Sequence, residues 1–483
     1  MTAWRRPALQ HTHDSDVQIV FFSHYYAPEG NAPASRTAEH CQRWAQCDEH
    51  RVTVITCAPN VPDGKVYPGY RNRFRPTREM IDGVEVIRVW TWIRPGGGKL
   101  SLMLNYLSYL ITALLTFFLV VRRPDVILAT TPQFFCGIAG VLAGKLRRVP
   151  TVLEVRDIWP ESIVTVGAMK RGWVIRALEK LERWMYRSAD HLVTVGPGYR
   201  DNILEKVDVR DRLSMVTNGV DPARFTPVAD DGQLRKRYDL GDRLVCSYIG
   251  TIGRAHGLEI VIRAAQRLQE TQSEQIAFLV VGGGANLDHL RQAVEDAGVQ
   301  DRVVLTGRLD KSQMPAVLAA SDVCLVHLSK VDLFEHVIPS KIFETMAMEK
   351  PIIMGVKGRA RDIVLQAGAG VPLEPESDEE LARFLDQRFD QPETLVEMGK
   401  RGRGFVMKYF DRDLLAADLL QILERVGRGD VFCHPDRRWE PQDSWDASSG
   451  AGSLRESISG QQTPDADAVQ VPDQSVGQDQ SVS

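Results

Sequence analysis

The chain has 483 residues, of which 43% are hydrophobic and 25% are charged, and this composition is typical of a globular protein with two domain cores. Its seven cysteines stand apart from one another, with no close pair at metal-ligand spacing and no pattern of a disulfide framework. The composition therefore argues against a small disulfide-rich secreted protein and favours a reducing cytoplasm.

The net charge of −4 is unevenly distributed along the chain. Residues 1–210 hold 28 Lys and Arg against 20 Asp and Glu, whereas the remainder holds 31 against 43. A basic first half can indicate an anionic partner such as a membrane surface or a lipid phosphate, although an unevenly solvated surface explains it equally well. Nucleic acid is excluded as a partner because no basic motif with interleaved aromatic residues occurs.

Residues 1–15 include two arginines but lack the apolar run of a secretory signal, so we expect a flexible N-terminus and no export. Short apolar, β-branched segments then alternate with helical stretches in two series. The segments lie at 17–24, 51–58, 84–92, 125–132, 151–157 and 191–198, and then at 244–251, 277–284, 303–308, 323–328 and 351–356. The pattern predicts an α/β chain with two doubly wound, Rossmann-like domains.

The domain boundary is marked by VTNGVDPARFTP, with its Asn-Gly pair and two prolines. We therefore expect an N-terminal domain at 16–215, a hinge at 216–228 and a C-terminal domain at 229–410. Residues 411–428 have apolar positions at helical spacing and predict a C-terminal helix. Residues 429–483 are rich in Ser, Gln and Asp and predict a disordered tail.

A run of 22 uncharged residues, 100–121, is long enough to span a bilayer and is bracketed by Lys99, Arg122 and Arg123. Because it lies between two predicted strands of one sheet, a true span would put those strands on opposite sides of the membrane. We expect a helix that lies partly in the fold and partly in the lipid interface, with an ordinary buried core helix as the alternative.

Ligands of doubly wound sheets bind beyond the carboxyl ends of the strands, so two such domains facing each other across a cleft should hold a ligand between those edges. After the first strand, the loop HYYAPEGNAPASR contains the candidate residues Gly30 and Asn31 before the next helix. A glycine there lets the backbone approach a ligand near a helix start, although a plain turn explains one glycine equally well.

The segment EVRDIWPES, residues 154–162, places three carboxylates and an arginine at the end of another strand. Charged groups in an apolar run are costly unless they are paired or used. Asp157 and Glu161 are candidates to orient a substrate hydroxyl or to take its proton. An ion pair of Arg156 together with a helix cap is the structural alternative.

The second half of the chain opens with the glycine-rich turn YIGTIGRAHG, residues 248–257. Gly250 and Arg254 suit a diphosphate there, because backbone N–H groups and a guanidinium both bind phosphate oxygens. The glycine spacing differs from the dinucleotide fingerprint, which argues against hydride transfer. At later strand ends, Gly283 offers flat backbone to a nucleobase and Arg308 a cation to phosphate.

The most informative segment is HVIPSKIFETMAMEKPII, residues 336–353. Pro339 and Ser340 precede a helix on which Lys341 and Glu344 are three residues apart, hence on one face near its positive N-terminus. Lys341 can neutralise phosphate while Glu344 accepts hydrogen bonds from two ribose hydroxyls. An ordinary i, i+3 surface ion pair is the alternative.

Together with NGVDPARF at the hinge, the motifs PSKIFE, EVRDIWPES and PEGNAPASR make residues 16–427 resemble the retaining glycosyltransferases of family 4, which have the GT-B fold. The chain looks most similar to bacterial amino-sugar transferases of O-antigen and capsule assembly, of the fucosamine and quinovosamine type. Those enzymes use UDP-linked N-acetylated sugars and lipid-linked acceptors on the cytoplasmic membrane face.

The resemblance implies roles for individual residues. It implies that Gly30 lies near the transferred sugar and Asp157 near the reaction centre. It also implies that Arg254 and Lys341 hold the diphosphate and that Glu344 holds the ribose.

Where the family often shows two glutamates eight residues apart, this chain has His336 at the earlier position, and we expect His336 to contact the donor. The resemblance implies a glycosyltransferase that acts on a lipid-linked saccharide, peripherally on the inner face of the cytoplasmic membrane. No metal or cofactor is expected, because no DxD-like acidic pair stands at a strand end. Two alternatives stay open: a UDP-sugar 2-epimerase of the same architecture, and a nucleotide-sugar-binding scaffold without catalysis.

Overall fold

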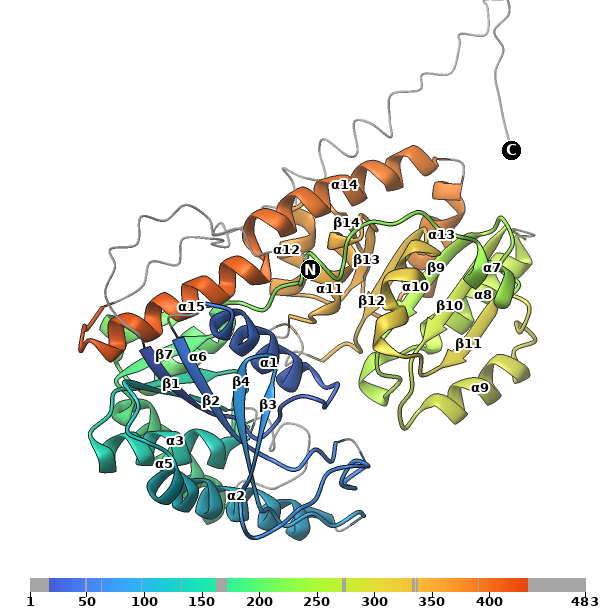
Figure 1. Ribbon diagram of the computed structural model, residues 1–483. Helices are drawn as coiled ribbons and strands as arrows, with labels where there is room; N and C mark the ends of the chain where they lie inside the picture. The colour runs from blue at the N-terminus through green and yellow to red at the C-terminus, as the bar shows by residue number, and fades with distance from the viewer. Residues whose placement is uncertain are drawn as a thin grey trace, which may run out of the picture. The chain divides into compact units, whose positions relative to one another are not determined.

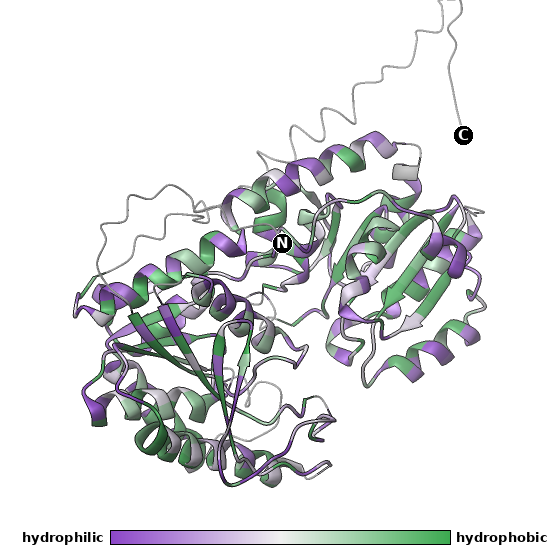
Figure 2. Ribbon diagram, in the orientation of Figure 1, coloured by the Kyte–Doolittle hydropathy of each residue, from purple (hydrophilic) through white to green (hydrophobic). Residues whose placement is uncertain are grey.

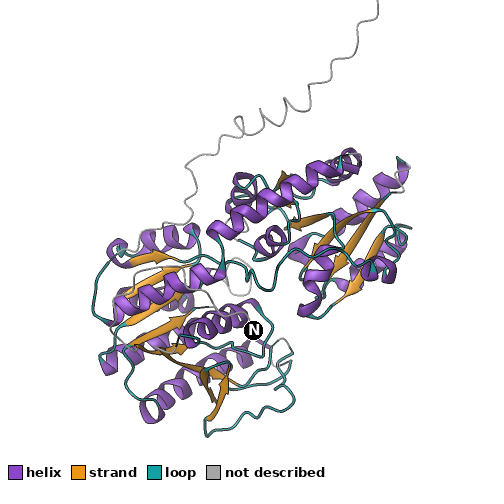
Figure 3. Ribbon diagram, turned by 45° about the horizontal axis from the view of Figure 1, so that its top comes forward, coloured by secondary structure: helices purple, strands orange, loops and turns teal. Residues whose placement is uncertain are grey.

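The computed structural model of this protein describes residues 17–47, 50–61, 63–96, 98–131, 133–161, 172–271, 275–331, 335, 338–389 and 391–432. Two open sheets dominate this part of the chain, and helices lie on both sides of each sheet (Figure 1, Figure 3). The predicted α/β class with two doubly wound domains is therefore confirmed.

The first sheet has eight strands in the order β3-β4-β2-β1-β5-β6-β7-β8, and only β3 runs antiparallel to its neighbour. Its parallel strands are covered by helices on both faces, which explains why most of their residues are buried and apolar. The strands are β1 (Val17–Phe22), β2 (His50–Cys57), β3 (Thr77–Ile81), β4 (Val84–Val89), β5 (Val126–Thr130), β6 (Thr151–Val155), β7 (His191–Thr194) and β8 (Leu213–Met215).

One face of this sheet is covered by α2, α3 and α5, and the other by α1 and the C-terminal α15. Close packing of α3 depends on Gly140, because a Cβ atom there would come within 2.3 Å of the Ala129 Cβ. The helices are α1 (Ala32–Ala45), α2 (Gly98–Val120), α3 (Phe134–Arg147), α5 (Trp173–Ser188) and α6 (Pro197–Lys206), with a 3-10 turn η1 (Arg210–Arg212).

The second sheet has six parallel strands in the order β11-β10-β9-β12-β13-β14. They are β9 (Leu244–Ile249), β10 (Ile276–Val281), β11 (Val303–Gly307), β12 (Val323–His327), β13 (Ile352–Gly355) and β14 (Gly370–Pro372). The helices and turns of this domain are α7 (Gln233–Arg237), η2 (Arg254–His256), α8 (Glu259–Glu270), α9 (Leu287–Asp296), η3 (Lys311–Gln313), α10 (Met314–Ala319), α11 (Lys341–Ala347), α12 (Arg359–Gln366), α13 (Asp378–Phe389) and α14 (Pro392–Tyr409).

The last helix, α15 (Arg412–Gly427), returns to the first domain, where the Trp44 indole N–H donates to the Ala416 carbonyl over 2.9 Å. Packing continues beyond residue 428, the predicted end of the ordered chain. Phe432 is buried against His191 and lies under the Arg425 guanidinium. The predicted tail therefore starts at least four residues too early, and its remainder, like residues 1–15, lies outside the described residues.

Three strands were not expected from the sequence. β3 is a polar edge strand whose side chains are largely exposed, so it lacks the apolar signal of the central strands. β8 and β14 are three residues long and give no pattern of their own. All three lie at or beside the sheet edges, away from the central strands that carry the candidate site.

Candidate functional site

The predicted site residues follow the carboxyl ends of central strands. In each sheet the chain starts in the middle and builds outward in both directions, so the loops after β1 and β5, and after β9 and β12, leave on either side of a switch point. Crevices at such points are the usual ligand sites of doubly wound sheets.

In the second domain, two glycine-rich loops lie directly against each other. The Gly250 N–H donates to the Val281 carbonyl over 2.9 Å, and the Ile252 N–H donates to the Gly283 carbonyl over 3.0 Å. A Cβ atom at Gly282 would lie 1.7 Å from the Gly250 carbonyl oxygen, so only glycine fits there. The predicted residues Gly250 and Gly283 thus form one flat backbone surface at the end of β9 and β10.

Lys341 opens α11 and lies beside this surface. Its Nζ atom is 4.0 Å from the centre of the Tyr248 ring, and a Cβ atom on Gly250 would lie 3.0 Å from it. Although the residue is partly exposed, Nζ is buried and has no hydrogen-bond partner among the described residues. Burial lowers the pKa of Lys341 to about 8. A cation held this way is prepared for an anionic ligand.

Glu344 lies one turn further along α11, and burial raises the pKa of its carboxyl group. The charges of Lys311, Arg412 and Arg224 oppose this rise, so the carboxylate lies in a basic environment. Lys311 also connects the two domains, because its Nζ donates to the Ser35 hydroxyl of α1 over 2.6 Å. The i, i+3 surface ion pair between Lys341 and Glu344 is not present.

Two other residues predicted to bind the donor are more exposed than Lys341 and Glu344. Arg254 and Arg308 are exposed, and Arg254 stands in the turn η2 directly after the glycine-rich loop. Pro339 and Ser340 precede α11 as predicted. His336 lies outside the described residues.

His327, which the sequence analysis did not single out, holds the η2 turn in place. The His327 Nδ1 donates to the His256 carbonyl over 2.7 Å, and its Nε2 accepts from the Glu376 N–H over 2.9 Å. Burial lowers the pKa of His327, which keeps the ring neutral and compatible with both bonds. In the sequence, the position of His327 at the end of an apolar strand could have indicated this role.

In the first domain, the loop after β1 prepares the start of α1. Asn31 is the N-cap, and its Oδ1 accepts from the Ala34 N–H over 2.8 Å. Gly30 is exposed, and a Cβ atom placed on it would have no atom within 4 Å. Gly30 therefore leaves open space beside a helix start, which suits a ligand.

Asp157 follows β6, and its charge acts on two tyrosines. Burial and the Asp157 charge together raise the pKa of Tyr199 to about 12, and the same charge acts on Tyr106 of α2. Tyr106 in turn shares a hydrogen bond with Tyr25 of the loop after β1. Tyr25 and Tyr106 were missed because their helix and loop are 81 positions apart and neither carries a charge.

For the segment EVRDIWPES, an ion pair of Arg156 was the alternative to a catalytic role, and the structure contains such a pair. Glu154 is buried, and its Oε1 lies 2.9 Å from Arg36 Nε and its Oε2 lies 3.8 Å from Arg156 Nη1. Burial alone would raise the pKa of Glu154, but Arg36 and Arg156 lower it overall. Arg36 also donates to the Thr217 carbonyl over 2.7 Å, so this pair fixes the hinge to the first domain.

Glu161 differs from Asp157 in its surroundings. Its carboxylate lies 2.9 Å from the Lys206 Nζ and accepts from the Asn202 amide over 3.0 Å. Lys206 also pairs with Glu182 over 2.8 Å. Two side chains of α6 thus bind the Glu161 carboxylate. The catalytic role of Glu161 stays a prediction.

The long helix α2 has two distinct faces. Asn105, Tyr109, Ala113 and Phe117 are buried against the sheet, whereas the residues at the complementary helical positions are exposed. We call this exposed set the α2 stripe: Leu100, Leu102, Leu104, Leu107, Ile111, Leu115 and Leu119. Residues 100–120 are long and apolar enough to span a bilayer, and only 28% of their most apolar stretch is buried. Figure 2 shows the hydrophobic colour along α2. The helix is therefore not an ordinary buried core helix.

Two family models match the chain: that of a glycosyl transferase 4-like domain at residues 31–219 and that of glycosyl transferases group 1 at residues 231–405. WcaI of Escherichia coli K12, a glycosyl transferase assigned to colanic acid biosynthesis, is 26% identical over 77% of this chain and 92% of its own length. WbjE of Pseudomonas aeruginosa, named as a glycosyltransferase, is 30% identical over 55% of this chain and 66% of its own length.

A GDP-mannose-dependent phosphatidylinositol monomannoside mannosyltransferase of Mycobacterium tuberculosis is 30% identical over 45% of this chain and 56% of its own length. Among solved structures, HepE of Anabaena in complex with UDP is 16% identical, with a TM-score of 0.62 over 85% of this chain and 99% of that one. At this identity the likeness shows the fold alone.

Proposed function

Since this chain is a glycosyltransferase of the GT-B fold, we propose that it transfers an N-acetylated amino sugar from UDP to a lipid-linked saccharide, with retention of anomeric configuration. The observation that carries the proposal is the buried Nζ of Lys341, which has no hydrogen-bond partner among the described residues and lies beside the glycine-rich surface at Gly250 and Gly283. The diphosphate of a nucleotide would be the anion that pairs with Lys341, and the flat backbone at Gly250 and Gly283 suits the nucleobase.

The donor would lie along α11 and the η2 turn. Lys341 and the exposed Arg254 would bind the diphosphate, and the Glu344 carboxylate would accept from the ribose hydroxyls. Departure of the diphosphate leaves an oxocarbenium-like sugar, so these cations stabilise the charge that develops on the leaving phosphate.

The acceptor would approach from the first domain. Its hydroxyl oxygen forms the new bond to the anomeric carbon on the face that the diphosphate leaves, while the bond from that carbon to the phosphate oxygen breaks. The electron pair of the broken bond stays on the phosphate, which is also a suitable acceptor for the hydroxyl proton. Asp157, whose charge acts on Tyr106, would orient the acceptor hydroxyl. This route gives retention without a covalent enzyme intermediate.

The α2 stripe supports a membrane-bound acceptor and a peripheral location on the inner face of the cytoplasmic membrane. The stripe presents seven exposed leucine and isoleucine side chains, and contiguous apolar surface of this kind usually marks an interaction site. Tyr106 comes from the same helix, which would bring a lipid-linked acceptor close to Asp157. A UDP-sugar 2-epimerase has no use for such a surface.

The test is nucleotide release from a panel of UDP-N-acetylhexosamines and GDP-mannose, with and without lipid-linked saccharide from bacterial membranes, and with EDTA. Acceptor-dependent, EDTA-resistant release of UDP from one amino-sugar donor is expected. Release of UDP without acceptor would instead favour an epimerase or hydrolase, and release of GDP from GDP-mannose would replace the proposed donor. A protein that binds UDP but turns over no donor would be a scaffold.

A further inference from the structure

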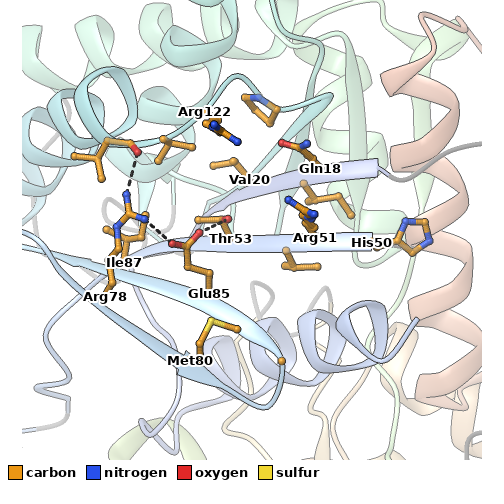
Figure 4. A pocket seen from close by; sticks show the side chains of 16 residues that line it. Gln18, Val20, His50, Arg51, Thr53, Arg78, Met80, Glu85, Ile87 and Arg122 are labelled. Atoms are coloured by element: carbon orange, nitrogen blue, oxygen red, sulfur yellow. Dashed lines mark hydrogen bonds and ion pairs between the residues drawn. The ribbon is translucent and has the colours of Figure 1, made fainter. Parts of the chain in front are cut away.

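A cavity of about 370 Å³ lies at the opposite edge of the first sheet from the candidate site (Figure 4). It is lined by the starts of β1 and β2, by β3 and β4, and by the C-terminal end of α2. Since the candidate site follows the carboxyl ends of the strands, this cavity is separate from the donor and acceptor positions.

The lining of the cavity is basic. Arg78 is neutralised, because its Nη1 lies 2.9 Å from Glu85 and its Nη2 donates to the Val120 carbonyl over 3.0 Å. Arg51 and Arg122 come from β2 and from the residues just after α2, and both are exposed. No acidic side chain of the described residues pairs with either, so the cavity keeps two available guanidinium groups.

Apolar surface continues from the cavity along α2. Leu119 and Leu115, the last two members of the α2 stripe, are 80% and 55% exposed, and Leu119 immediately precedes the lining residue Val120. Met80, which also lines the cavity, is 67% exposed. Two guanidinium groups beside exposed apolar side chains match a molecule that is anionic at one end and hydrocarbon at the other.

We propose that this cavity binds the phosphate of an anionic phospholipid headgroup through Arg51 and Arg122, while the acyl chains lie against the α2 stripe. The inference rests on the proposed membrane docking of α2 and adds a specific headgroup site to it. Because α2 carries Tyr106, near the proposed acceptor position, and reaches the cavity at its C-terminal end, a bound headgroup would fix the helix in the membrane surface.

The experiment is co-sedimentation of the full chain with phosphatidylcholine vesicles, with and without phosphatidylglycerol. Arg51→Ala and Arg122→Ala should each weaken binding to anionic vesicles by ~10-fold or more, as expected for loss of a charge-assisted hydrogen bond. Arg123→Ala is the matched control: Arg123 adjoins Arg122 and is exposed, but it does not line the cavity. The affinity of this variant for anionic vesicles should fall by no more than the ~5-fold expected for the loss of one cation near an anionic membrane surface.

The outcomes separate the headgroup site from the docking itself. Leu115→Ser with Leu119→Ser should reduce binding to both kinds of vesicle, whereas the arginine variants should affect only anionic ones. If the leucine variant loses binding but Arg122→Ala behaves like Arg123→Ala, docking stands and the headgroup site is refuted. If the leucine variant still binds like the parent, the membrane proposal fails as well. Saturable binding of inorganic phosphate that requires Arg51 and Arg122, with unchanged vesicle binding, would assign the cavity to a free anion instead.

Discussion

The Nζ atom of Lys341 lies 4.0 Å from the centre of the Tyr248 ring, with no hydrogen-bond acceptor among the described residues. A ring face attracts a cation but replaces only part of the hydration that the ammonium group loses on burial. The arrangement thus costs folding free energy, and an anionic ligand at Lys341 would recover it. Residues 341 and 248 come from different elements, so this relationship is visible only in the folded chain.

Lys341→Met should weaken UDP binding and increase the stability of the fold. The fall of the Lys341 pKa from 10.5 to about 8 corresponds to at most ~3 kcal/mol of unfavourable burial at neutral pH. We therefore expect the variant to be ~1–3 kcal/mol more stable to urea, because methionine fills similar volume without the charge. Its affinity for UDP, measured by calorimetry, should fall by ~10²-fold or more. A variant that binds UDP like the parent would remove Lys341 from the donor site.

The same pKa predicts the pH dependence of donor binding. Free Lys341 loses its proton as the pH rises through about 8, whereas the diphosphate stays ionised. UDP affinity should therefore fall by up to ~10-fold per pH unit above that value, because binding must restore the proton. In the absence of ligand the sign is opposite: the unfolded chain holds the proton up to about pH 10, so the free energy of unfolding should rise between pH 8 and 10. Both trends should be absent from Lys341→Met.

The fold was largely predictable because its central strands are rich in apolar, β-branched residues and its loops carry glycine and proline. The polar edge strand β3 has no such pattern, and the packing of Phe432 depends on His191, which lies far away in the sequence. Within the site, Lys341 and Glu344 could be placed on one helix from their spacing. Their environment could not, because Tyr248, Lys311 and Arg412 reach them from three other segments.

Glu344 is expected to act on the ribose of the donor. Glu344→Ala should weaken UDP binding by ~10²-fold through loss of hydrogen bonds to a charged acceptor. The sharper measurement compares UDP with 2′-deoxy-UDP in both proteins. The parent should discriminate between the two nucleotides, while Glu344→Ala should bind them almost equally. Glu349→Gln, at the other end of the same segment, is the control and should keep the discrimination of the parent. Equal discrimination in Glu344→Ala would mean that the carboxylate does not contact the ribose.

Asp157 and Glu161 should separate into a functional and a structural carboxylate. Asp157→Asn is expected to slow sugar transfer by ~10²–10⁴-fold while UDP affinity stays unchanged. Glu161→Gln should leave transfer within ~2-fold and lower stability by at most ~1 kcal/mol, because it only weakens the pair with Lys206. Lys206→Met should also leave transfer within ~2-fold, but it should lower stability more than Glu161→Gln does, because it also removes the cation that pairs with the buried Glu182 carboxylate. A large loss of transfer in Glu161→Gln alone would restore Glu161 as a catalytic candidate.

Tyr106→Phe tests whether α2 carries part of the acceptor site. The substitution removes the hydrogen bond to Tyr25 without changing the ring, so the acceptor KM should rise by ~3–10-fold. The affinity for UDP should stay at the parental value, because α11 is untouched. Tyr109→Phe is the matched control on the same helix: its buried hydroxyl donates to the Ile55 carbonyl over 2.7 Å. This control should lower the unfolding temperature and leave the acceptor KM unchanged. If both variants lower stability and neither changes the acceptor KM, Tyr106 serves packing alone, and the acceptor must be bound by other residues near Asp157.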